Sequence, residues 1–170
     1  MIVGDPFDFA ISWEIVESWN TKASVWENGI FRMYIGDVQL PPKLEVAELK
    51  VCIGTYAGMN FSAFENSLTS QATLNRRLDL VRNYIQQKNT KEELALFSEG
   101  QILNLTCTVM EDQNCWAFLL KKSDKEESII WTLDDGDEIH EHTLPLKTVE
   151  NVIRNLEAEW NKGLNQQRLM

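Results

Sequence analysis

The fold class is decided by the opening stretch Phe7-Asp8-Phe9-Ala10-Ile11-Ser12-Trp13-Glu14-Ile15. Large apolar residues occupy its odd positions, whereas Asp8, Ser12 and Glu14 occupy even positions. Because successive side chains of a strand point to opposite faces, this alternation predicts a half-buried strand. We expect its odd face to lie in the core and its even face to meet water.

Further alternating stretches predict that other strands join this one in a mostly antiparallel sheet. Gly36-Asp37 follows an alternating run, and glycine at the first central position of a two-residue loop favours a type II′ hairpin. A polar loop over Asn20–Asn28 precedes that run. The strands expected after the opening one are Ile30–Ile35, Val38–Leu40, Leu44–Ile53, Ile102–Met110, Cys115–Lys121, Ser128–Leu133 and Ile139–Leu144.

The middle of the chain changes to a helical period. Leu74, Leu78, Val81 and Ile85 recur at helical spacing from Ala72 onward and predict an amphipathic helix. The opposite, solvated face of this helix is expected to carry Arg76, Arg77 and Arg82. Thr90 and Glu93 have the spacing of a capping box, which predicts a second, short helix over Lys91–Ser98.

A last helix is expected over Lys147–Lys162, ended by Gly163 and followed by a loose tail at about residues 164–170. Runs of strands separated by helices, without regular βαβ alternation, are typical of α+β folds. The sequence therefore predicts one α+β domain over residues 1–170. It consists of a mostly antiparallel β-sheet with a central helical insertion and a C-terminal amphipathic helix packed on the sheet.

The charge of the chain restricts its partners. A net charge of −10 and a pI of about 4.7 disfavour binding to nucleic acid or to an anionic membrane, because both would repel the protein. A basic protein is the natural complement. Charge alone has a simpler explanation, because net charge also keeps a domain soluble.

The cysteines and the N-terminus predict a cytoplasmic location. Cys52, Cys107 and Cys115 are odd in number and lack C-x-x-C spacing, which argues against a disulfide framework and a zinc site. Met1 is not followed by a basic region and an apolar region, so no signal peptide is expected. No apolar run is long enough to span a membrane.

The two histidines, His140 and His142, are the first candidates for chemistry. On a strand they would point the same way, beside Glu138 and Glu141, and could chelate a metal. A third protein ligand at suitable spacing is not identifiable, and solvent-facing residues near a strand end explain the pattern equally well. No metal site and no cofactor is therefore assigned.

A cysteine–histidine pair is the second candidate. Cys107 falls on the apolar face of its predicted strand, which favours an inert core thiol, whereas Cys115 lies beside a turn and is more open. No local signature surrounds either residue. The alternative function is thus a small-ligand or metal-binding module, with a weak hydrolase activity that uses Cys115 and His142.

The densest acidic run is Asp134-Asp135-Gly136-Asp137-Glu138. Its order does not match an EF-hand, which requires ligands at alternate positions, glycine at the sixth and glutamate at the twelfth. A hairpin turn is the simplest interpretation. As a rigid acidic projection, the run could also pair with a basic cleft of a partner.

Short motifs in the first quarter of the chain resemble the start of the bacterial immunity protein 42 family. These motifs are Gly4-Asp5-Pro6-Phe7, Phe9-Ala10-Ile11, Val16-Glu17-Ser18-Trp19 and Asn28-Gly29-Ile30-Phe31. Such proteins are predicted antidotes of polymorphic-toxin systems, and no catalytic motif accompanies the resemblance. It implies a protein that is not an enzyme and that neutralises a cognate toxin domain in the cytoplasm by direct contact.

The interface with such a toxin would combine a charged rim with buried anchors. Trp19 and Trp26 are candidates for the anchors if they are exposed. Packing in the core is the favoured alternative for Trp19, whereas Trp26 lies in a polar loop. The rim is expected to consist of Asp134, Asp135, Asp137 and Glu138.

Overall fold

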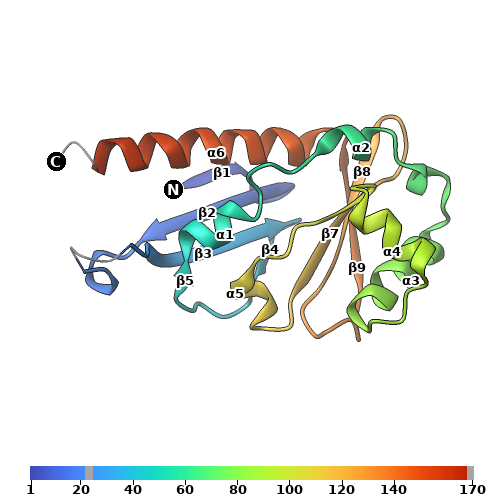
Figure 1. Cartoon of the computed structure of the whole chain (residues 1–170), viewed down its shortest axis with the longest axis horizontal. Coiled ribbons are helices and arrows are strands. Elements are labelled where there is room, and N and C mark those ends of the chain that lie inside the picture. The colour runs from blue at the N-terminus through green and yellow to red at the C-terminus, as the bar shows by residue number, and fades with distance from the viewer. Residues whose placement is uncertain (22–24, 168–170) are drawn as a thin grey trace.

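The computed structural model describes residues 1–21 and 25–167, and it contains two antiparallel sheets. The first sheet has the order β1-β2-β3-β4, with β5 pairing beside β3, and the second has the order β6-β7-β8-β9 (Figure 1). The strands of the first are β1 (Ile2–Asp5), β2 (Phe9–Ile15), β3 (Asn28–Ile35), β4 (Val38–Leu40) and β5 (Ala47–Glu48). Those of the second are β6 (Ile102–Asn104), β7 (Trp116–Lys121), β8 (Glu126–Thr132) and β9 (His140–Pro145).

The helices lie mostly between the two sheets in the sequence. The α-helices are α1 (Leu49–Gly54), α2 (Phe61–Glu65), α3 (Leu74–Ile85), α4 (Lys91–Ser98), α5 (Thr108–Glu111) and α6 (Thr148–Gln167). Two short 3₁₀ helices, η1 (Glu17–Trp19) and η2 (Leu68–Gln71), complete the described secondary structure. The α+β class, the helical insertion and the packing of α6 on strands are confirmed, but the strands form two sheets. None of the described helices is long and apolar enough to cross a membrane.

The opening strand is confirmed, with two corrections. Phe7 is 75% exposed because it lies in the turn between β1 and β2, where the Asp8 backbone N–H donates to the Asp5 carbonyl. Ala10 and Ser12, predicted to meet water, are buried as well. Their cross-strand partners on β3 are Tyr34 and Arg32, whose side chains are much larger.

The hairpin between β3 and β4 is confirmed, but its turn differs from the prediction. Gly36 and Asp37 both have positive φ angles, 54° and 71°, so the turn is of type I′ and not II′. A Cβ atom on Gly36 would lie 2.8 Å from Nδ1 of His142 on β9. The first sheet therefore contacts the second at this turn.

Two predicted strands are wrong over most of their length. Leu44–Ile53 contains only the two-residue strand β5 before α1 begins, and the Glu48 carboxylate caps this helix by accepting from the Val51 backbone N–H. Within Ile102–Met110 only β6 forms a strand, and α5 follows it. Short apolar runs fit either period, and here packing selected the helix.

The predicted middle helices are confirmed as α3 and α4, including the capping box of Thr90 and Glu93. Arg77 is the exception to the predicted solvated face, because it is only 5% exposed. Its guanidinium lies 2.8 Å from the Glu141 carboxylate of β9. Arg77 of α3 thus forms an ion pair with a glutamate of the sheet, which the helical period alone does not predict.

The C-terminal helix is longer than predicted. It begins at Thr148 and continues through Gly163 to Gln167, so the predicted end at Gly163 is wrong. A Cβ atom on Gly163 would meet nothing within 4 Å, so neither a special φ angle nor crowding ends the helix there. The predicted loose tail falls partly within the helix, and residues 168–170 lie outside the described part of the chain.

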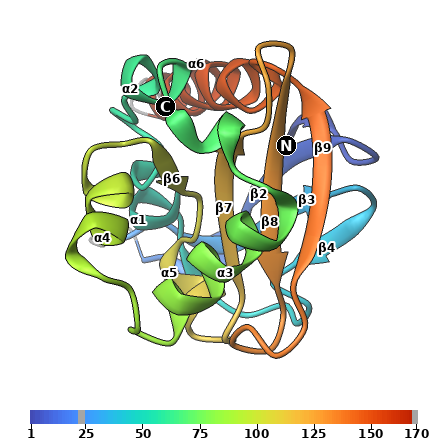
Figure 2. The ribbon, with the colours of Figure 1, turned by 90° about the vertical axis from the view of Figure 1, so that its right-hand side faces the viewer.

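The second sheet is covered on both faces. On one face Leu119, Ile129 and Trp131 join the main core, which also includes residues of the first sheet and of α6. On the other face Phe118 and Ile130 form a separate cluster with residues of α3 and β6. Figure 2 shows α3 in front of β7 and β8, and α4 beside β6. This helical layer forms one wall of the candidate site.

Candidate functional site

The acidic turn between β8 and β9 holds its first carboxylate in place by hydrogen bonds. Oδ1 of Asp134 accepts from the Thr132 hydroxyl at 2.6 Å and from the Glu138 backbone N–H at 3.0 Å. These donors, the Thr132 hydroxyl first, hold the pKa of Asp134 below its ordinary value. The side chains of Asp134, Asp135, Asp137 and Glu138 are all exposed. The turn therefore presents charge in a defined conformation.

The turn is also fastened to the start of β7. The Asp135 backbone N–H donates to the Asn114 carbonyl at 3.0 Å, and Oδ1 of Asp135 accepts from Nε1 of Trp116 at 2.9 Å. Asp135 has a φ of 61°, a left-handed conformation that aspartate tolerates better than most residues. The predicted hairpin turn is thus present, and it is attached to a neighbouring loop.

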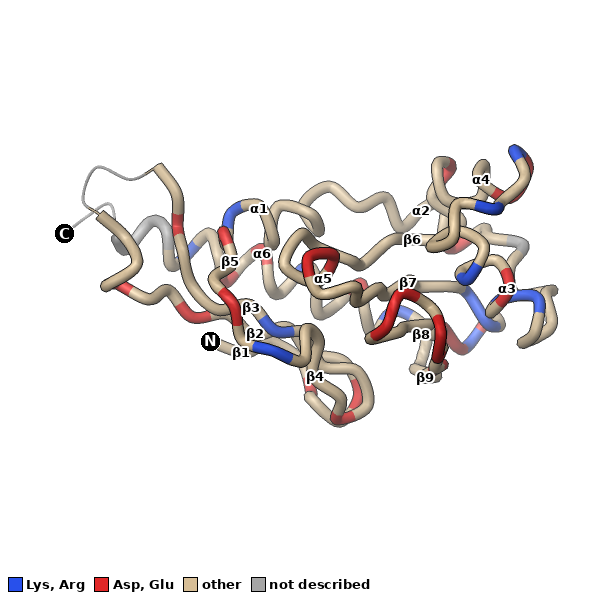
Figure 3. The backbone as a smooth tube through the Cα atoms, turned by 90° about the horizontal axis from the view of Figure 1, so that it is seen from below, with Lys and Arg blue, Asp and Glu red and all other residues tan. Residues whose placement is uncertain are grey.

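That neighbouring loop adds two carboxylates that the sequence did not assign to the site. Glu111 and Asp112, at the end of α5, are exposed. Figure 3 shows α5 and the β8–β9 turn on the same side of the molecule. Together the two loops form what we call the acidic face, which consists of Glu111, Asp112, Asp134, Asp135, Asp137 and Glu138.

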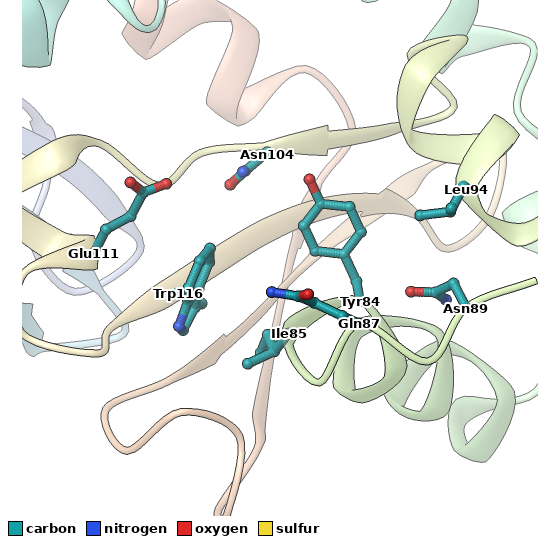
Figure 4. A pocket seen from close by; sticks show the side chains of 8 residues that line it. All are labelled: Tyr84, Ile85, Gln87, Asn89, Leu94, Asn104, Glu111 and Trp116. Carbon is teal, nitrogen blue, oxygen red and sulfur yellow. The ribbon is translucent and has the colours of Figure 1, made fainter.

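A cavity of about 480 Å³ adjoins the acidic face. Figure 4 shows Glu111, Trp116, Tyr84 and Leu94 in a row across it. We call this space the aromatic cavity; its lining residues are Tyr84, Ile85, Gln87, Asn89, Leu94, Asn104, Glu111 and Trp116. They come from α3, α4, β6, α5, β7 and the loop after α3, and none of them is a lysine or an arginine.

Stacked aromatic rings support the cavity from the sheet side. The Trp116 ring lies parallel to that of Phe118, with centroids 6.4 Å apart, and Tyr84 meets Phe118 edge-on at 5.3 Å. Tyr84 also stacks on Phe97 of α4 at 4.2 Å. Because each ring is held by another, Tyr84 and Trp116 have defined positions in the cavity wall.

The cavity and the acidic face form one continuous site. Glu111 belongs to both, and Trp116 lines the cavity while donating to Asp135 of the turn. Gly136 of the turn faces Ile85, whose Cδ1 would lie 3.5 Å from a Cβ atom on this glycine. The site therefore combines apolar surface with a charged border, as protein-binding sites do.

The predicted tryptophan anchor lies elsewhere. Trp26 is 57% exposed and lies two residues before β3, and Figure 1 shows the start of β3 at the opposite end of the molecule from α3 and α4. The structure thus does not bring Trp26 together with the acidic turn. The prediction that Trp19 packs in the core is wrong, because this residue is 41% exposed and η1 buries none of its residues.

The histidines do not form a site with other ligands. His140 and His142 share one face of β9, as predicted, but His140 stacks on Trp131 with ring centroids 4.3 Å apart. His142 packs against Gly36 of the first sheet. Among residues 1–21 and 25–167, no group of three or more histidine, cysteine or acidic side chains is placed to hold a metal ion.

The cysteine–histidine pair of the alternative hypothesis is not assembled either. Cys115 lies just before Trp116 of β7, which pairs with Thr132 of β8. His142 of β9 pairs with Ile129 of β8, which lies three residues from Thr132. Cys115 and His142 are therefore separated by roughly 10 Å or more. Contrary to the prediction of an open position, Cys115 is fully buried. Burial raises its pKa to about 11, so the thiol is not activated.

Comparisons with known proteins agree with the sequence motifs. The family model described as Immunity protein 42 matches residues 1–159. The chain belongs to the immunity protein 42 family. As an immunity protein it neutralises a toxin. The match of the family model confirms the resemblance of the opening motifs to this family.

Among solved structures, this immunity protein is similar to the crystal structure of CdiI from Burkholderia dolosa AUO158. The TM-score is 0.67 and the identity 19%, and the match covers 94% of this chain and 99% of that one. At this level of identity the likeness shows a shared fold. The search of curated proteins found no match to the chain.

Sequence reasoning missed the cavity because its lining comes from six segments. Trp116 and Leu94 fall within the predicted strand Cys115–Lys121 and the predicted helix Lys91–Ser98, and neither pattern indicates a site there. The one available signal was Trp116 beside the polar turn that precedes β7, because tryptophan is enriched at interfaces.

Proposed function

We propose that this immunity protein neutralises its cognate toxin domain by direct contact through the acidic face, without catalysing a reaction. The observation that carries the proposal is that two loops with six exposed acidic residues between them are joined by the Asp135 contacts with Asn114 and Trp116. A basic surface on the toxin is the complement. Nucleic acid and anionic membranes are disfavoured as partners, because both would repel the acidic protein.

The electrostatic part of the interaction acts mainly on association. Complementary charge at the border of an interface raises the association rate and selects the partner, whereas buried anchors determine how long the complex lasts. With a net charge of −10, the whole protein reinforces the acidic face. We place the complex in the cytoplasm, where a toxin must be neutralised before it reaches its target.

The test is to co-express the tagged chain with the toxin domain encoded beside it and to measure the affinity of the purified pair. Asp137 and Glu138 are suited to charge reversal because both are exposed. For Asp137→Lys/Glu138→Lys we expect at least a tenfold loss of affinity, mainly from slower association, and a weaker dependence on salt.

The matched control is Glu17→Lys/Glu126→Lys, which changes the net charge equally at exposed positions outside the acidic face. Trp26→Ala, at the far end of the molecule, is a second control. If the Glu17 and Glu126 reversals weaken binding as much as those at Asp137 and Glu138, net charge alone acts and the proposed interface is wrong.

A further inference from the structure

The aromatic cavity is lined by side chains that suit a cation. At one end lies the carboxylate of Glu111, and Oδ1 of Asp135 accepts a hydrogen bond from the indole of Trp116, which lines the cavity. At the other end, Oδ1 of Asn89 is buried and has no hydrogen-bond partner within the described residues. All three groups are hydrogen-bond acceptors, of which Asp135 already accepts from Trp116, and no lysine or arginine lines the cavity.

The walls of the cavity are suited to a flat, partly apolar group. Tyr84 and Trp116 are held by ring stacking on Phe97 and Phe118, and their π-systems attract cations over their faces. Ile85 and Leu94 supply apolar surface for an aliphatic stem. A guanidinium combines planarity, charge and a methylene stem, and it can donate two hydrogen bonds to one carboxylate.

Other occupants fit less well. A purely apolar side chain would bury the exposed carboxylate of Glu111 without a partner, which is costly. An acidic group would be repelled by the acidic face that borders the opening. The acidic face instead selects basic segments. The same charge that attracts the partner therefore favours a partner with basic side chains, which fit the cavity.

We infer that the aromatic cavity receives an arginine side chain of the toxin, with its stem against Leu94 and Ile85, its guanidinium plane on the aromatic wall and its N–H groups toward Glu111. The inference rests on the proposed toxin contact at the acidic face and names the anchor within it. A central arginine in an aromatic pocket is a common form of interface hot spot.

The main test uses a matched pair of substitutions. Leu94 lines the cavity and is 46% exposed, whereas Leu74 lies outside it and is 45% exposed. Leu94→Arg places a guanidinium in the cavity, so we expect it to lower the affinity for the co-purified toxin domain at least tenfold. Leu74→Arg adds the same group elsewhere and is expected to change the affinity less than twofold. Because both positions are exposed, both variants should keep the wild-type circular dichroism spectrum.

A second test examines the chemistry of the occupant in the full chain alone. N-acetyl-arginine-amide at millimolar concentration should shift the NMR signal of the Trp116 indole N–H, whereas the neutral isostere N-acetyl-citrulline-amide should not. Glu111→Gln should abolish the shift, while Glu126→Gln, at an exposed position outside the acidic face, should leave it unchanged. Equal shifts with the two probes would show that the cavity does not select a cation.

The outcomes separate this inference from the proposed function. If Leu94→Arg binds the toxin domain as tightly as Leu74→Arg while Asp137→Lys/Glu138→Lys still weakens binding, the cavity is not the anchor and the acidic face remains the interface. If the wild-type chain does not bind the toxin domain at all, both the proposed contact at the acidic face and the arginine anchor are wrong.

Discussion

Cys115 illustrates how the environment of a single residue decides its chemistry in this protein. Its Sγ donates to the Gln113 carbonyl at 3.4 Å, and no part of the residue is exposed. Burial, and then the nearby charge of Asp134, raise its pKa to about 11. Cys107 is also buried, and burial raises its pKa well above the ordinary value. Both residues are therefore inert thiols at neutral pH.

We predict that Cys115 resists alkylation in the folded protein. With a pKa of about 11, only about one thiol in 1,000 is ionised at pH 8, compared with about a quarter at the ordinary value of about 8.5. Iodoacetamide labelling of Cys115, followed by peptide mass spectrometry, should be at least 100-fold slower in the folded chain than in urea. The rate should rise about tenfold per pH unit up to the pKa. Equal labelling rates at pH 8 in the folded and unfolded chain would contradict this assignment.

At the scale of elements, the docking of α3 on the second sheet depends on a buried ion pair. Nε and Nη2 of Arg77 donate to Oε1 of Glu141 at 3.3 and 2.8 Å, and Nη1 donates to the Ala72 carbonyl at 2.8 Å. The two side chains are only 6% and 14% exposed. A pair in this position fixes how the helix lies on β9, although it adds less stability than its short distances suggest.

We predict that replacing one partner of this ion pair lowers the free energy of unfolding more than replacing both partners. Glu141→Leu leaves the Arg77 charge buried without a partner and should lower the free energy of unfolding by about 3 kcal/mol. The double variant Arg77→Met/Glu141→Leu should lose less, because no uncompensated charge remains. Urea unfolding measures both values.

The exposed pair of Lys162 and Glu159 provides the control for this experiment. Its side chains are 67% and 38% exposed, so Glu159→Gln should change the stability by about 0.5 kcal/mol or less. A double variant that is no more stable than Glu141→Leu alone would show that lost packing, and not the stranded charge, causes the destabilisation.

At the scale of the whole molecule, α6 joins the two sheets. The Glu127 carboxylate of β8 accepts from the Lys147 and Val149 backbone N–H groups at 2.9 and 2.8 Å, which fastens the start of α6 to the second sheet. Toward its other end, Trp160 meets Trp13 of the first sheet edge-on, with centroids 6.3 Å apart. The main core likewise contains residues of both sheets.

We therefore predict that the chain unfolds as a single domain, in one cooperative transition. Because the two sheets share a core and a helix, the unfolding of one sheet would expose the apolar surface of the other. Thermal unfolding followed by far-ultraviolet circular dichroism and by tryptophan fluorescence should give the same midpoint. Two separate transitions would show that the sheets form independent domains.

The sequence by itself determined the features that depend on neighbouring residues. Alternation predicted β2, β3, β7 and β8, and helical spacing with a capping box predicted α3 and α4. The acidic run predicted an exposed turn. These features are local, because residues on the same face of a strand or a helix are only two to four positions apart.

Only the tertiary structure decided the rest. The apolar residues Leu49, Cys52 and Ile53 fit a strand or a helix equally well, and packing selected the helix α1. Arg77 is buried because β9 supplies Glu141, which lies 64 residues away. The aromatic cavity likewise exists only where α3, α4, α5, β6 and β7 meet, and no local pattern records which distant side chains packing will bring together.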